Sequence, residues 1–252
     1  MRENRLKKME DYIRKKGSAS LDELCREFDV SKNTIRRDVA EIVEYTDIRK
    51  IYGGVSVQRN VIPPPFAERS AVNQDVKESL GKKAAQFVND GDIIYVDSGT
   101  TTCRMIDYLK ERSNVTVVTH SLDVINRAAT LPGLNIIALS GTLNRKTLSF
   151  TGQSTIDVLQ DLNISKAFMA ANGLSVKNGA TQSTSIEFAI KKCVVNRSDT
   201  VFMVLERRKI GSVSLLTYCS LERIDTIITE KRPEQVFCEE YEALGGQIIL
   251  PD

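Results

Sequence analysis

Three consecutive prolines at residues 63–65 place the strongest constraint on how this 252-residue chain can fold. Proline fixes its own backbone torsion and lacks an amide hydrogen, so such a run is extended and stiff, and continues neither a helix nor a sheet. The run therefore predicts two separately packed parts. We place a small domain at residues 1–57, a proline-rich linker at residues 58–74 and a larger domain at residues 75–252.

The composition is that of an ordinary globular protein, with 41% hydrophobic and 27% charged residues. No apolar run approaches the roughly 20 residues of a membrane helix, and the charged residues 1–17 lack the apolar block of a secretory signal. We therefore expect a cytoplasmic protein without a membrane partner. The five cysteines are scattered, and most are expected to be small buried hydrophobes. His120 is the only histidine, which excludes a multi-histidine metal cluster; we expect no metal, no cofactor and no catalytic residue.

Two short helices are predicted ahead of residue 30. Leu6, Met9 and Ile13 mark one face of the first helix, which Gly17 ends. Ser20 is a suitable N-cap for the second helix, and Glu23 completes a capping box. The second helix stops just before residue 31, so the second and third helices have the spacing of a helix-turn-helix.

Residues 31–43 have the pattern of a helix that enters DNA. Ser31 is a suitable N-cap. The apolar positions at helical spacing form one buried stripe: Ile35, Val39, Ile42 and Val43. The side chains facing away from it, of types that contact base edges and phosphates, are Asn33, Arg36, Arg37 and Ala40. Taken alone, this face is equally well interpreted as the solvated side of an ordinary core helix.

A basic hairpin is predicted directly after this helix, at residues 48–57, with Gly53 and Gly54 in a tight turn. A basic hairpin in this position is a wing, which contacts the neighbouring DNA backbone or groove. The predicted partner is double-stranded DNA, and the predicted contacts are Ser31, Lys32, Asn33, Thr34, Arg36, Arg37, Arg49, Lys50 and Tyr52. Residues 1–60 hold 14 lysines and arginines against 11 acidic residues, a small excess that supports nucleic acid only weakly. A head that binds protein is the alternative.

Residues 5–57 resemble the N-terminal winged helix-turn-helix of the DeoR family of bacterial transcription regulators. The similarity rests on the SxxTIRRD block at residues 31–38 and on the Tyr-Gly-Gly that begins at Tyr52. The resemblance implies that the small domain binds operator DNA.

Beyond the linker, strands alternate with helices of about ten residues, which predicts right-handed crossovers and a mainly parallel α/β fold. The expected strands are residues 93–97, 115–119, 134–139, 167–171, 200–205, 226–229 and 247–250. The expected helices are residues 76–89, 102–110, 121–130, 155–161 and 185–195, with a further one beginning near Pro233.

In such sheets, ligands bind beyond the carboxyl ends of the strands. The loop after the first of these strands is Asp97, Ser98, Gly99, Thr100, Thr101 and Thr102, and it leads into a helix. Gly99 allows close approach of a ligand, while hydroxyls and helix-start amides offer donors to an anion. The loop is neither a Walker loop nor G-x-G-x-x-G, so no nucleotide is implied. A Ser/Thr-rich capped turn is the alternative.

Polar residues at other strand ends are expected to converge on the same edge of the sheet. They are His120, Ser121, Gly141, Asn172, Gly173 and Lys209. Each by itself is equally explained by ordinary loop chemistry.

The larger domain also resembles the DeoR family, in its effector-binding half. The matching motifs are D-S-G-T-T-T at residues 97–102, A-N-G-L at 171–174, G-A-T at 179–181 and K-I-G at 209–211. The resemblance implies a fold related to ribose-5-phosphate isomerase, with residues 98–102 holding the phosphate of a sugar phosphate. The chain has Glu206, Arg207 and Arg208 where the family usually has Asp-x-Ser, and the added arginines favour a more anionic ligand or a subunit contact.

Two functions follow from these patterns. The first is a transcriptional regulator, most simply a repressor of a carbohydrate-utilisation operon, controlled by a phosphorylated sugar and acting as a homo-oligomer (dimer or tetramer). The second is a sugar-phosphate isomerase-like enzyme with an accessory DNA-binding head. The isomerases need a carboxylate base where this chain has the amide of Asn172, although Asp97 and Glu187 remain as possible bases. The regulator is therefore favoured.

Overall fold

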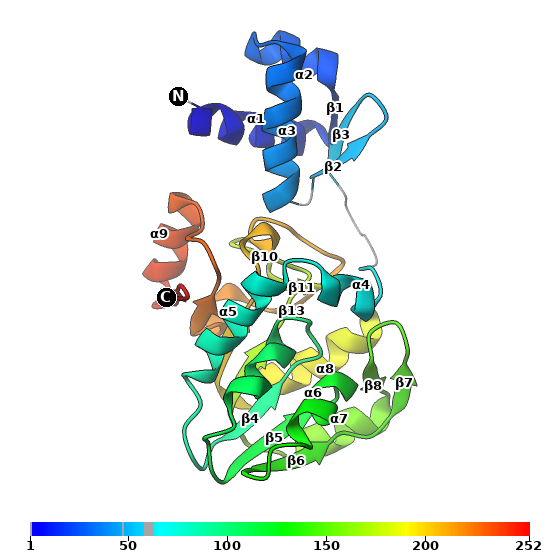
Figure 1. Ribbon diagram of the computed structural model, residues 1–252, viewed down its shortest axis with the longest axis vertical. Coiled ribbons are helices and arrows are strands. Elements are labelled where there is room, and N and C mark those ends of the chain that lie inside the picture. The colour runs from blue at the N-terminus through cyan, green and yellow to red at the C-terminus, as the bar shows by residue number, and fades with distance from the viewer. Residues whose placement is uncertain (1, 47, 58–62) are drawn as a thin grey trace.

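The computed structural model describes residues 2–46, 48–57 and 63–252. A small N-terminal head sits on one end of a larger α/β domain (Figure 1). The first five residues of the expected linker, 58–62, lie outside the described residues.

Three helices build the head: α1 (Arg2–Lys16), α2 (Leu21–Phe28) and α3 (Lys32–Tyr45). Two of them begin at the predicted caps. The Ser20 hydroxyl accepts the Glu23 amide hydrogen at 3.1 Å, and the Ser31 hydroxyl accepts that of Thr34 at 3.3 Å. Asp29 ends α2 in the left-handed conformation, with φ 49°. The fully buried side chains between the helices include Met9, Ile13, Leu24 and Ile35.

The wing is an antiparallel pair of strands, β2 (Ile48–Ile51) and β3 (Gly54–Val57). The turn consists of Tyr52 and Gly53, and Gly53 has a φ of 75°, which glycine adopts without strain. Gly54, which was also expected in the turn, instead begins β3. A short strand that the sequence pattern did not predict, β1 (Ser18–Ser20), pairs with β3. It ties the start of α2 to the wing.

The larger domain contains, within the described residues, a seven-stranded sheet of order β15-β14-β12-β9-β4-β5-β6. All neighbouring strands run parallel. Its strands are β4 (Ile93–Val96), β5 (Val115–Thr119), β6 (Leu134–Ala138), β9 (Ile164–Met169), β12 (Ser198–Val204), β14 (Thr226–Ile228) and β15 (Gln247–Ile249). The strand order changes direction between β4 and β9. That position is the topological switch point, where α/β sheets bind ligands.

Helices cover both faces of this sheet (Figure 1), and side chains alternate between the two cores. Tyr95 faces one core, which includes Val194, while Ile94 and Val96 face the other, which includes Leu80. The helices are α5 (Gln74–Ala85), α6 (Leu122–Ala128), α7 (Gln153–Gln160), α8 (Ser185–Asn196) and α9 (Gln235–Ala243). The helix expected at residues 102–110 is instead the 3₁₀ helix η1 (Thr102–Tyr108).

Two small antiparallel sheets surround the carboxyl ends of the main strands, and neither was predicted. One contains β10 (Gly173–Ser175), β11 (Gly179–Gln182) and β13 (Leu216–Cys219). The other is the hairpin of β7 (Thr142–Asn144) and β8 (Ser149–Thr151). The 3₁₀ helices η2 (Arg207–Lys209) and η3 (Leu221–Arg223) complete the edge.

Part of the expected linker is a helix, α4 (Phe66–Ala71), rather than an extended segment. Pro65 precedes its first turn, where a proline is compatible with a helix. Phe66 is buried in the core of the larger domain, and the Lys77 ammonium donates to the carbonyls of Arg69 and Val72. Residues 66–71 are therefore packed with the larger domain. Among residues 2–46, 48–57 and 63–252, none of the helices is long and apolar enough to cross a membrane.

Candidate functional site

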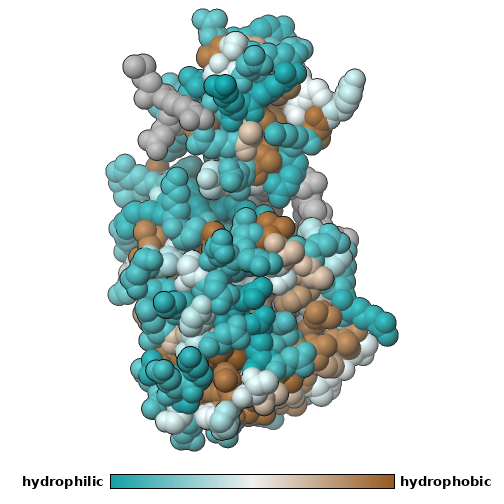
Figure 2. Space-filling view, in the orientation of Figure 1, coloured by the Kyte–Doolittle hydropathy of each residue, from teal (hydrophilic) through white to brown (hydrophobic). Residues whose placement is uncertain are grey.

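The exposed face of α3 presents free polar side chains. Asn33, Arg36, Arg37 and Lys50 are exposed and make no hydrogen bond or ion pair with the described residues. Tyr52 projects fully into solvent from the tip of the wing. The head is largely hydrophilic in the space-filling view (Figure 2). These five side chains could all reach a polyanion without breaking an existing contact.

The other predicted DNA contacts are already engaged. The hydroxyls of Ser31 and Thr34 lie 2.9 Å apart within the helix cap, and the Lys32 ammonium pairs with Asp22 at 2.6 Å. Arg49 donates to the carbonyls of Val43, Thr46 and Ile48 at 3.2 to 3.4 Å. Arg49 thus caps the C-terminal end of α3 and faces the larger domain, away from the position predicted for it.

The loop after β4 crosses the switch point and turns tightly against the end of β9. A Cβ added at Gly99 would lie 2.6 Å from Ala170 Cβ, so only glycine fits there. The Thr102 hydroxyl donates to the carbonyls of Asp97 and Gly99 at 2.7 and 3.1 Å and fixes the turn. The loop is therefore held in shape by its own residues before any ligand arrives.

The same loop leaves a cluster of unused donors. The backbone N–H groups of Gly99, Thr100 and Thr101 have no acceptor among the described residues, and neither do the hydroxyls of Ser98, Thr100 and Thr101. Backbone amides that converge at the start of a helix bind oxyanions well. The arrangement suits a phosphate group.

A buried ion pair supports the loop from below. Asp97 accepts the amide hydrogens of Ser98 at 2.8 Å and Ala170 at 2.9 Å, and it also accepts from the Lys191 ammonium. Lys191 donates to the Ala170 carbonyl as well, at 2.7 Å. Burial opposes ionisation of Asp97, but Lys191 and His120 outweigh it and lower the pKa of Asp97. The pair ties the ends of β4 and β9 together at the switch point.

A cavity of about 80 Å³ opens above this loop. The residues predicted for the effector that line it are Ser98, Gly99, Thr100, Thr101, Asn172 and Lys209. Asn172 accepts the Ser183 amide hydrogen through its side-chain oxygen at 2.9 Å, leaving its amide nitrogen available. Burial lowers the pKa of Lys209 to about 8. Within the described part of the chain, the Lys209 ammonium makes no hydrogen bond or ion pair.

The remaining predicted effector residues lie outside the cavity, each for a structural reason. Asp97 and Thr102 are buried beneath the loop that they support. His120 is fully buried and shares a 2.6 Å hydrogen bond with Tyr95, and burial lowers its pKa to about 4. Ser121 caps α6 by accepting the amide hydrogen of Val124. Gly141 packs against the Thr151 backbone, and Gly173 against that of Ser212.

Several lining residues were not predicted: Arg69, Lys146, Gln182, Ser183 and Lys191. Glu187, which was considered only as a possible base, also lines the cavity; burial raises its pKa, and it accepts from Gln182. Arg69 and Lys146 come from the linker and from the β7–β8 hairpin, segments without a motif. One feature of the sequence could have indicated Lys191, because it is a lysine on the apolar side of an amphipathic helix.

The side chains of the Glu206-Arg207-Arg208 segment make different contacts. Glu206 is buried and accepts two hydrogen bonds from Arg208, at 2.8 and 3.0 Å, and one from Asn73. These donors and Lys209 overcome the opposing effect of burial and lower the pKa of Glu206 to about 2. The Arg207 guanidinium donates to the Ile210 carbonyl at 3.1 Å and lies 3.9 Å from the Glu234 carboxylate. Arg207 lines neither cavity, so of the two arginines expected to favour a more anionic ligand or a subunit contact, only Arg208 lines a cavity.

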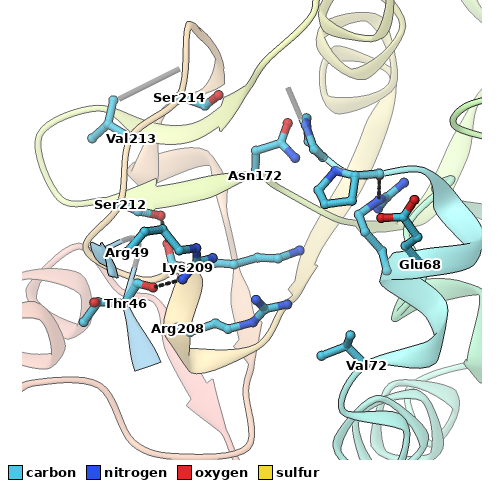
Figure 3. A pocket seen from close by; sticks show the side chains of 13 residues that line it. Thr46, Arg49, Glu68, Val72, Asn172, Arg208, Lys209, Ser212, Val213 and Ser214 are labelled. Atoms are coloured by element: carbon cyan, nitrogen blue, oxygen red, sulfur yellow. Dashed lines mark hydrogen bonds between the residues drawn. The ribbon is translucent and has the colours of Figure 1, made fainter. Parts of the chain in front are cut away.

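The head contacts the larger domain close to this segment. The C-terminal end of α3 lies against η2. Lys231 lies over the Tyr45 ring at 5.5 Å from its centroid, and the Lys7 ammonium is 3.9 Å from the Glu234 carboxylate. The region between them contains a second cavity, of about 320 Å³, lined by both domains (Figure 3).

Two family models match the chain. The DeoR-like helix-turn-helix domain matches residues 5–61, and the DeoR C terminal sensor domain matches residues 72–231.

Curated proteins similar over most of the chain have regulatory names. The HTH-type transcriptional regulator IolR of Bacillus subtilis (strain 168) is 40% identical over 227 residues, 90% of each chain. The glycerol-3-phosphate regulon repressor of Escherichia coli (strain K12) is 25% identical over 88% of each chain. The lactose phosphotransferase system repressor of Staphylococcus epidermidis is 27% identical, over 90% of this chain and 91% of its own.

Among solved structures, the fold is similar to a D-ribose-5-phosphate isomerase in complex with phospho-erythronic acid. The TM-score is 0.41, with 20% identity over 54% of each chain. Ribose 5-phosphate isomerase A from Methanocaldococcus jannaschii gives a TM-score of 0.41, with 16% identity over 55% of each chain.

Proposed function

The chain belongs to the DeoR family of transcriptional regulators, and from this premise we propose that it is a repressor that binds operator DNA through its head and a phosphorylated sugar through its larger domain. The domain matched to the family's sensor is a regulatory domain, so the chain is not an isomerase. Repression of a carbohydrate-utilisation operon is the expected role, and the cytoplasm the expected location. The names of the lactose phosphotransferase system and glycerol-3-phosphate regulon repressors support the role.

The DNA-binding half of the proposal rests on α3. The exposed side chains Asn33, Arg36 and Arg37 lie on one face of the helix and are unpaired among the described residues. Guanidinium groups bind guanine edges or phosphates, and the amide of asparagine binds adenine. Lys50 and Tyr52 extend this surface along the wing, where they are placed to contact the DNA backbone.

One observation carries the effector half of the proposal. The donors of Gly99, Thr100 and Thr101 converge without an acceptor in the described structure, in a cavity that also holds the Lys209 ammonium. Donors that face a cavity and have no protein acceptor are free to bind the oxygens of an anion. A dianionic phosphate supplies several acceptors at once and is attracted by the adjacent cations.

We further propose a homo-oligomer, a dimer or a tetramer. One head buries little DNA surface, and two heads on two half-sites add their binding free energies. Hydrophobic side chains gather over the lower right of the larger domain in Figure 2. Exposed apolar residues of that domain include Leu143 of β7 and Val158 of α7. Effector binding then controls the operator complex only if the effector prefers one arrangement of the heads.

Thermal unfolding of the full chain against phosphorylated sugars, each paired with its unphosphorylated parent, tests the effector site. A ligand at a hundredfold excess over its dissociation constant stabilises the protein by about 2.7 kcal/mol. We expect stabilisation by a phosphorylated sugar and not by its parent, and loss of the effect in Thr100→Val. Thr116→Val, in β5 and outside the cavity, is the matched control. Equal stabilisation by parent sugars, or a full response in Thr100→Val, would contradict the assignment.

A further inference from the structure

The two cavities beside η2 adjoin one another. They share four lining residues, Pro63, Arg69, Asn172 and Lys209. The cavity above the phosphate loop, at about 80 Å³, is well below the roughly 300 Å³ at which small-molecule sites begin. The second cavity, at about 320 Å³, reaches that size. A sugar phosphate whose phosphate sits on the loop is larger than the first cavity, and the second cavity is the adjoining space into which its sugar can extend.

The second cavity is strongly cationic. Its lining includes Arg69, Arg208 and Lys209 from the larger domain and Arg49 from the head, against the single carboxylate of Glu68. Figure 3 shows the side chains of Arg49, Lys209 and Arg208 lying next to one another along one side of the space. The far end of a ligand in this cavity meets an excess of positive charge.

These cations have donors to spare. Arg208 uses Nε and one terminal nitrogen on Glu206, and Arg49 uses one terminal nitrogen on backbone carbonyls. The remaining nitrogens of both guanidinium groups, and the Lys209 ammonium, have no acceptor among the residues that the structure describes. The bonds of Arg49 to carbonyls, at 3.2 to 3.4 Å, are also long for N–H···O bonds.

We propose that the effector bridges the two domains, with its phosphate on the loop at residues 98–101 and a second anionic group held by Arg208 and Lys209 together with Arg49 of the head. This inference rests on the proposed phosphate site. A hydroxyl at the far end would leave the free donors of Arg49, Arg208 and Lys209 without an anionic acceptor, whereas a carboxylate or a second phosphate accepts paired bonds from arginine. Arg49 also caps the recognition helix α3. An effector bound to Arg49 therefore contacts the head directly, and its binding acts on the head without any intermediate residue.

Calorimetric titration of the full chain with three probes tests the inference. Glucose 6-phosphate carries one anionic group, 6-phosphogluconate adds a carboxylate, and glucose 1,6-bisphosphate adds a second phosphate. We expect at least one doubly anionic probe to bind about tenfold or more tightly than glucose 6-phosphate, the size of one charge-assisted hydrogen bond. Of the two doubly anionic probes, the one with the larger gain in affinity over glucose 6-phosphate shows whether the second group is a carboxylate or a phosphate.

Substitutions on either side of the cavity locate the second group. Arg49→Met and Arg208→Met should each lower the affinity for the doubly anionic probe about tenfold. The affinity for glucose 6-phosphate should not change in either variant. Lys50→Met, one residue further along β2 and outside both cavities, is the control for Arg49. Because Arg49 also caps α3 and Arg208 also binds the buried Glu206, both variants are checked for folding by circular dichroism, and the two readouts come from different domains.

The outcomes separate the two proposals. Equal affinity for the three probes, or a doubly anionic advantage that survives both substitutions, overturns the bridging inference and leaves the phosphate site standing. Absence of binding by all three probes, or binding that Thr100→Val leaves unchanged, overturns the phosphate site and the inference together.

Discussion

The head and the larger domain both present positive charge, but they hold it in opposite ways. Arg36 and Arg37 stand in solvent on a convex helix, without partners in the described structure. Lys191 is almost fully buried and bound to Asp97 beneath a preformed loop. Exposed cations are screened by salt and act additively on a polyanion, whereas a buried cation is part of the fold. Positive charge is thus free to bind an anion in the head and is part of the fold in the larger domain.

The largest expected effect tests the buried charge. Lys191→Met should leave Asp97 buried without its cation and lower the free energy of unfolding by about 3–5 kcal/mol. Urea unfolding measures this difference. Lys192→Met is the matched control, because the neighbouring lysine is exposed and only lies over the Phe188 ring. Equal losses in the two variants would show that the ion pair does not support the switch point.

The second prediction concerns the stability of the larger domain at acidic pH. Burial lowers the pKa of His120 to about 4, below its unfolded value of about 6.5. As the pH falls, the unfolded chain binds the proton first, so stability from the neutral ring is complete above about pH 6.5 and is lost towards about pH 4. At 1.36 kcal/mol per pKa unit the full loss is about 3 kcal/mol.

His120→Gln should flatten this part of the pH dependence, measured as the free energy of unfolding between pH 7 and pH 4.5. The head contains no histidine, so the effect belongs to the larger domain alone. An unchanged slope in the variant would place the acid sensitivity elsewhere.

The third prediction tests the exposed charge. Arg36→Ala should weaken operator binding by about 1–3 kcal/mol for a base contact; for a phosphate contact it should instead lower the slope of log affinity against log salt by about 1. Binding of labelled operator DNA by fluorescence anisotropy at several salt concentrations measures both quantities. Lys177→Ala, an exposed lysine of the larger domain, is the control. Unfolding stability should not change, in contrast to Lys191→Met. Unchanged affinity and salt slope would remove α3 as the recognition helix.

The smallest effect is expected at the exposed ion pair of the head. The Lys32 and Asp22 side chains retain 47% and 73% of their exposure, compared with 4% and 0% for Lys191 and Asp97. Lys32→Ala should therefore change the free energy of unfolding by less than about 1 kcal/mol. A loss of unfolding free energy close to that of Lys191→Met would show that the exposed pair in the head stabilises the protein as much as the buried pair in the larger domain, contrary to this prediction.

The features that follow from local pattern were predictable. The caps at Ser20 and Ser31, the wing turn at Gly53 and the parallel strands depend on residues close in sequence, and the structure confirms them. The position of the loop at residues 97–102 followed from its place after a strand.

Contacts between distant segments were not predictable in the same way. Lys191 reaches Asp97 across 94 residues, and no short motif signals such a pair. The Thr102 hydroxyl is bound to the Asp97 carbonyl and the His120 ring to the Tyr95 hydroxyl, so neither side chain reaches the cavity. Arg69 was missed because the proline run predicted an extended segment where a helix forms. Side-chain direction at a sheet edge is decided by tertiary packing, which a single sequence does not display.

The contact between α3 and η2 determines how far the opposite end of α3 moves when the helix tilts. The helix has 14 residues, so at 1.5 Å per residue it is about 21 Å long, and it rests on the larger domain by its C-terminal end. A tilt of about 10° about that end displaces the opposite end by about 3.6 Å, close to the 3.4 Å between base pairs. For the proposed DNA-binding role of α3, a movement beside the cavity that is too small to alter either fold is therefore enough to shift the opposite end of the helix by one step along the DNA.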